Sequence, residues 1–90
     1  MTVSLSQAEE ATREADRRLD VARKHLERAA NDVADYVGTY LGTSIYGQAR
    51  AAERLTALHD EYEAAHAAVE AADGAADAAW AAWEALDMVA

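Results

Sequence analysis

Tyr36-Val-Gly-Thr-Tyr-Leu-Gly-Thr-Ser-Ile-Tyr-Gly47 is the stretch of sequence that decides the fold. It holds three of the four glycines and three of the four tyrosines of a 90-residue chain that has no proline. A glycine weakens a helix interior by about 1 kcal/mol relative to alanine, and Thr43 or Ser44 can cap a new helix. The stretch predicts a turn over 38–47 between two long helices.

The segment before this turn has the repeat of a helix that packs along one seam. Its seam residues recur at alternating steps of three and four, and Thr12 is the one member that is neither aliphatic nor aromatic. Ser4 with Gln7 and Ser6 with Glu9 both match the capping box that starts a helix. We therefore expect a helix over 4–37, which the spacing of Tyr40 would extend towards Leu41. The seam consists of Leu5, Ala8, Thr12, Ala15, Leu19, Ala22, Leu26, Ala29, Val33, Tyr36 and Tyr40.

The segment after the turn repeats the same spacing. The register passes through Asp73 and Gly74 without a slip, which favours one helix over 45–89. Asp-Gly is also a turn signal, so a break at 73–76 followed by a third short helix is the alternative. The second seam consists of Gln48, Ala51, Leu55, Leu58, Tyr62, Ala65, Val69, Ala72, Ala76, Ala79, Trp83, Leu86 and Ala90.

Together the two seams predict a single all-α domain over 1–90, folded as an antiparallel, coiled-coil-like hairpin of two helices. So small a hairpin with an alanine-rich seam buries little apolar surface. We therefore expect oligomerisation to complete a bundle.

The two expected helices differ in length, and the difference singles out the tryptophans. At 1.5 Å per residue they would span roughly 50 and 70 Å. With a turn near Gly42, Trp83 would face the start of the chain, and Trp80 and Leu86 would have little of the hairpin to rest on. These three residues are expected to be apolar anchors for another subunit or protein. Tyr40 and Tyr46, at the tip of the hairpin, are further candidates for partner contact.

The net charge of -9 is concentrated in the second half of the chain. Residues 55–90 carry eight acidic side chains and no lysine or arginine. Such a surface should repel nucleic acid and anionic membrane and attract a basic protein. The alternative is a solvated face that keeps an apolar helix soluble. The candidate partner-binding acids are Asp60, Glu61, Glu63, Glu70, Asp73 and Asp77.

No residue set has the pattern of an active site, so neither catalysis nor a cofactor is expected. Glu63-x-x-His66 does have the spacing by which ferritin-like helices present two metal ligands from one face, with His59 nearby. A second such motif is missing within the chain. These residues remain a remote metal-binding alternative that would need two subunits to pair.

Tyr40-Leu41-Gly42, between two helical segments in a chain of this length, resembles the Trp-x-Gly turn of the WXG100, or ESAT-6-like, secreted hairpins. The resemblance implies an antiparallel helical hairpin and export. Tyrosine replaces the family's tryptophan, and the C-terminal Tyr-x-x-x-Asp/Glu signal is not present, although Trp83-x-x-x-Asp87 is similar to it.

These observations favour a function in protein binding. The chain shows no cleavable signal peptide and no membrane-spanning stretch, which indicates a cytoplasmic or virion-associated protein. The first hypothesis is an oligomeric structural or adaptor subunit, for example of a phage particle or a secretion system. The second is a small acidic phage inhibitor that imitates phosphates, in the manner of an anti-CRISPR, and binds a host defence complex.

Overall fold

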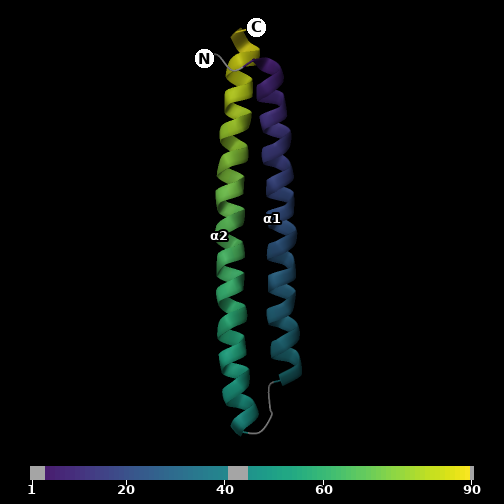
Figure 1. Ribbon diagram of the computed structural model, residues 1–90, viewed down its shortest axis with the longest axis vertical. Coiled ribbons are helices and arrows are strands. Elements are labelled where there is room, and N and C mark those ends of the chain that lie inside the picture. The colour runs from purple at the N-terminus through teal and green to yellow at the C-terminus, as the bar shows by residue number, and fades with distance from the viewer. Residues whose placement is uncertain (1–3, 41–44, 90) are drawn as a thin grey trace.

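The computed structural model describes residues 4–40 and 45–89, which form two helices lying side by side and antiparallel (Figure 1). Helix α1 covers Leu5–Tyr40 and helix α2 covers Ile45–Val89. The molecule measures 67 × 18 × 14 Å between Cα atoms. It is a rod two helices wide and one helix thick, so the expected all-α helical hairpin is confirmed.

Helix α1 begins with a capping box. The backbone N–H of Ser4 donates to Oε1 of Gln7 at 3.0 Å, and the N–H of Gln7 donates to Oγ of Ser4 at 3.2 Å. These bonds satisfy donors that the first helical turn leaves without an intrahelical partner. Of the two capping boxes expected from the sequence, the one at Ser4 is used, because the helix already begins at Leu5.

Helix α1 extends further into the glycine-containing stretch than its predicted end at 37, and it continues through Gly38 to Tyr40. Helix α2 begins at Ile45, which is where the predicted 45–89 helix begins. The three-four spacing that runs on to Tyr40 explains why α1 tolerates the helix-weakening effect of Gly38. The predicted caps Thr43 and Ser44 lie outside the described residues, as do Leu41 and Gly42.

The predicted seams are confirmed over 5–36 and 51–86, where every seam residue is buried or half-buried. Thr12, only 5% exposed, donates its hydroxyl to the carbonyl of Glu9 at 2.7 Å, so the polar member of the seam is satisfied within its own helix. No large side chain among the described residues is completely buried. The core is therefore one thin line of contacts between two helices. Its most buried apolar residues are Ala8, Leu19, Ala29, Leu58, Ala65 and Ala76.

Helix α2 runs through Asp73 and Gly74 without a break, and no third helix occurs in the described part of the chain. A Cβ atom built on Gly74 meets no atom within 4 Å. The glycine is therefore not required there by a close neighbour, and the continuous seam decides the local structure.

The register between the helices differs from the one expected from a turn near Gly42. The indole N–H of Trp80 donates to the carboxylate of Asp16 at 3.1 and 3.2 Å, and Arg23 lies 3.9 Å from Asp73. In both pairs the two residues are equidistant in sequence from position 48.

This register overturns the expected overhang of the C-terminal residues. The end of α2 lies against the start of α1, and Trp83 and Leu86 are half-buried there. Val89 and Met88 do remain exposed. At the end of the rod where the connection lies, the first turns of α2 extend past α1, and at the other end the last turn of α2 stands slightly beyond the start of α1 (Figure 1).

Leu58→Ala is expected to lower the free energy of unfolding by about 2–5 kcal/mol, because it removes one of the few buried large side chains from the seam. Met88→Ala, at a position that is 88% exposed, is the control and should change it by less than about 0.5 kcal/mol. Urea unfolding followed by circular dichroism measures both. Equal losses in the two variants would contradict the seam.

Gly74→Ala is expected to raise the free energy of unfolding by about 1 kcal/mol, because alanine favours the helix and its Cβ meets open space. Ala67→Gly, one heptad earlier on the same exposed line of α2, should lower it by a similar amount. The same urea titration measures both variants. A destabilised Gly74→Ala protein would show that the helix bends at this residue.

Candidate protein-binding surfaces

The rod has two broad sides, and the outward residues of α2 divide between them. A helix turns 100° per residue, so Ala64 and Asp73, nine residues apart, point in opposite directions across α2. Asp73 lies on the side where α2 meets Asp16 and Arg23 of α1. Ala64 lies on the other side.

The side of Asp73 carries a row of exposed carboxylates, called here the acidic face. Arg23 approaches Asp73 from α1, but both side chains are more than half exposed, so this ion pair contributes little stability. The acidic face consists of Glu63, Glu70, Asp73, Asp77, Glu84 and Asp87 of α2, all of them exposed. It presents a largely negative strip to solvent, with His59 and His66 beside Glu63 and Glu70.

The six acids predicted as one partner-binding set do not share this face. Glu63, Glu70, Asp73 and Asp77 lie on it. Asp60 points outward from the edge of the rod, away from α1. Glu61 lies on the opposite side, where it lines a groove between the helices.

From Ala64 onward the opposite side of α2 is apolar, a feature that the sequence analysis missed. It is called here the alanine face and consists of Ala64, Ala68, Ala71, Ala75, Ala78, Ala82, Ala85 and Val89, all exposed. These residues recur at alternating steps of four and three, a second series offset from the seam. The spacing is present in the sequence, but it does not stand out because alanine occupies so many other positions of α2.

Helix α1 contributes a mixed set of side chains to the same side as the alanine face. Val21 is 62% exposed, which makes it the largest apolar side chain that α1 leaves in solvent among its described residues. His25 and Arg28 lie one and two turns further along. Glu14 lies on the N-terminal side of Val21, where it pairs with Arg17 and, at 3.0 Å, with Arg18.

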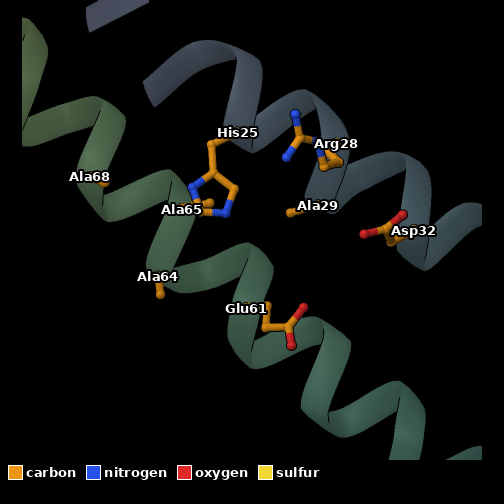
Figure 2. A pocket seen from close by; sticks show the side chains of 8 residues that line it. All are labelled: His25, Arg28, Ala29, Asp32, Glu61, Ala64, Ala65 and Ala68. Carbon is orange, nitrogen blue, oxygen red and sulfur yellow. The ribbon is translucent and has the colours of Figure 1, made fainter. Parts of the chain in front are cut away.

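A shallow groove of about 270 Å³ runs between the helices on this side (Figure 2). Figure 2 shows side chains from α1 and α2 on its two banks. The groove combines cationic, anionic and methyl groups and is open to solvent, so it suits a broad contact better than an enclosed small molecule. Its lining residues are His25, Arg28, Ala29, Asp32, Glu61, Ala64, Ala65 and Ala68.

The remote metal candidates make local pairs. His59 lies 3.5 Å from Glu63, and His66 lies 3.7 Å from Glu70 while its ring stacks on Tyr62. Within residues 4–40 and 45–89, no three histidine, aspartate or glutamate side chains come together to hold a metal ion. Glu63 and His66 are thus each turned to a neighbour four residues away.

The tryptophans form a cluster near the end of the rod where α1 begins. Their rings meet edge to face, with centroids 5.7 Å apart. Trp80 is 43% exposed while its N–H is held by Asp16. The N–H of Trp83 is buried and has no acceptor among the described residues. Trp80 therefore keeps an exposed ring surface that a partner could contact. Trp83 and Leu86 are half-buried, because they pack largely against α1. The side chains of Tyr40 and Tyr46 lie outside the described residues.

No protein-family model, curated protein or solved structure matches this chain. Neither described helix contains a stretch long and apolar enough to cross a membrane.

Trp80→Phe is expected to lower the free energy of unfolding by about 1 kcal/mol, because it removes the N–H that bonds to Asp16. Asp16→Asn should lose part of the same bond. A double-mutant cycle in urea should give a coupling energy of about 0.5–1.5 kcal/mol. Strict additivity of the two substitutions would show that the bond does not form in solution.

Proposed function

We propose that this chain works by binding protein chains, as a structural or adaptor subunit of an assembly, and that it is not an enzyme. The observation that carries the proposal is the thinness of the core. Only six apolar residues of the described chain are buried, four of them alanines. A lone layer of two helices that leaves an apolar side in solvent gains stability when another chain covers that side.

The acidic face supports a role in partner choice. It lies on the opposite side from the alanine face, so one partner can cover the apolar side while the carboxylates stay in solvent. Exposed charges of one sign speed the approach of basic surfaces and disfavour acidic ones. In this proposal the apolar side supplies affinity, and the acidic face selects which proteins approach.

One observation favours the second candidate, a small acidic inhibitor of a nucleic-acid-binding complex. Glu63, Glu70, Asp77 and Glu84 are spaced seven residues apart and form a row at intervals of about 10.5 Å along α2. All four are exposed. A straight row of anionic groups is what a phosphate-binding surface recognises.

The two candidates are separated by capture of binding proteins from a lysate of the native host, washed at about 50 mM and then about 500 mM salt. A subunit held by apolar contact should keep its partners through the second wash, because salt screens only charge. A phosphate mimic should release a basic complex in that wash. Recovery of no protein at either salt would contradict both candidates.

A matched pair of variants identifies the surface responsible for capture. Neutralising the acidic row should abolish binding of an inhibitor's target and leave a structural subunit's partners in place. Neutralising four exposed carboxylates outside the acidic face and the groove gives the same change in net charge and controls for it. The acidic-row variant is Glu63→Gln, Glu70→Gln, Asp77→Asn and Glu84→Gln, and the control is Glu10→Gln, Asp20→Asn, Glu27→Gln and Glu53→Gln.

A further inference from the structure

We propose that the occupant of the alanine face is a second copy of this chain, docked antiparallel about a two-fold axis at the level of Val21, close to Ala75, to give a four-helix bundle. This inference rests on the proposed function and deepens it by naming the partner and the surface. Four observations carry it: the symmetry of the face, the placement of its charges, its area and the position of the acidic face.

The alanine face is symmetric about the level of the proposed axis. Ala75 lies within one residue of the middle of the run from Ala64 to Ala85. Val21 lies within about one helical turn of this level, because the pairs Asp16–Trp80 and Arg23–Asp73 join the two helices on either side of Val21 through side chains that lean towards the start of each helix. A two-fold axis there brings each Val21 against its copy and the exposed alanines of α2 against those of the second copy. Such a self-complementary patch is what an isologous dimer requires.

The charges beside Val21 complement one another in this arrangement. Glu14 and Arg28 lie seven residues before and after Val21 on the same side of α1. The two-fold axis therefore sets Glu14 opposite Arg28 of the second copy, twice in each dimer. Glu14 already pairs with Arg17 and Arg18, so Arg28 would join an existing cluster of charges.

A parallel stack of two hairpins is less favourable. In a parallel stack the ends of the two hairpins are aligned, and α1 of each copy lies on α2 of the other. Asp32 and Glu61 line the same groove from opposite helices, so they lie close together along the rod. The parallel stack would therefore oppose these two like charges, which costs stability. The antiparallel stack avoids this contact.

The area of the face matches what a stable dimer buries. The proposed overlap along α1 consists of residues 5–20 before Val21 and residues 22–37 after it. Together these two segments span about 48 Å. With the 18 Å width of the rod, the overlap presents about 860 Å² per chain. Standard protein interfaces bury roughly 800 Å² on each partner.

The acidic face also fits this dimer. Because it lies on the far side of each hairpin, the two negative strips end up on the outer sides of the bundle, separated by both layers. Docking through the acidic face would instead oppose them. The charge of the chain thus selects the alanine face for self-association.

The test measures the mass of the wild-type chain by sedimentation equilibrium at about 100 μM and lower. The expected result is twice the 9.7 kDa monomer. Ala75→Arg places a long cation in the middle of the alanine face, near the axis, and should weaken the dimer at least about tenfold. Ala34→Arg, on an exposed alanine that points to the side of Asp16, should leave the mass unchanged. Far-UV circular dichroism checks that both variants keep their helices.

A cross-link tests the antiparallel orientation. The chain has no cysteine, so a single introduced one reports on one contact. Val21→Cys should give a disulfide-linked dimer on oxidation, because the two copies of the residue meet at the axis. Ala11→Cys, ten residues away, places its two copies about 30 Å apart and should stay unlinked.

A monomeric wild type at the highest concentration, an unchanged Ala75→Arg dimer, or linking through Ala11→Cys but not Val21→Cys would each overturn the inference. The failure of the proposed function looks different. A monomer that still captures a salt-resistant partner would contradict self-association through the alanine face but would support the proposed function. A monomer that captures no protein would contradict both proposals.

Discussion

The contact between α1 and α2 is a single line of side chains spaced three and four residues apart, and the rest of the structure depends on it. Because every seam residue from Leu5 to Tyr36 and from Ala51 to Leu86 faces the other helix, the direction of all remaining residues is fixed. That constraint sorts the alanines and carboxylates of α2 onto opposite sides. A slip of one residue in the seam would rotate the helix and mix the two faces.

The fold could be read from the sequence because its determinants are local. The capping box at Ser4 and the periodicity of both helices need no knowledge of a distant residue. The register could not be read in the same way. An alanine-rich seam looks nearly the same after a shift of one heptad, so it does not identify which residues oppose each other. Two pairs mark the register, Trp80 with Asp16 and Arg23 with Asp73. They lie beside the seam, at positions about which the apolar repeat carries no information.

The candidate surfaces were only partly visible in the sequence. The excess of acidic residues in α2 was plain, but their grouping depended on helical angle, which places Glu61 across the helix from Asp73. The alanine face was overlooked because the sequence alone does not distinguish an exposed alanine from a buried one. Only the placement of the partner helix shows which alanines are covered. His59 and His66 likewise drew attention by their spacing, whereas the structure pairs each with a carboxylate one turn away.

The hairpin places Leu5 and Val89 at the same end of the rod, opposite the connection between the helices (Figure 1). This arrangement decides how the molecule responds to mechanical tension. A force applied at those two residues pulls the helices apart sideways and opens the seam one contact at a time, starting beside Leu86. A force between Leu5 and the connecting end would instead pull along α1 and load many contacts together. The same fold is therefore weak when peeled from its open end and stronger along its length.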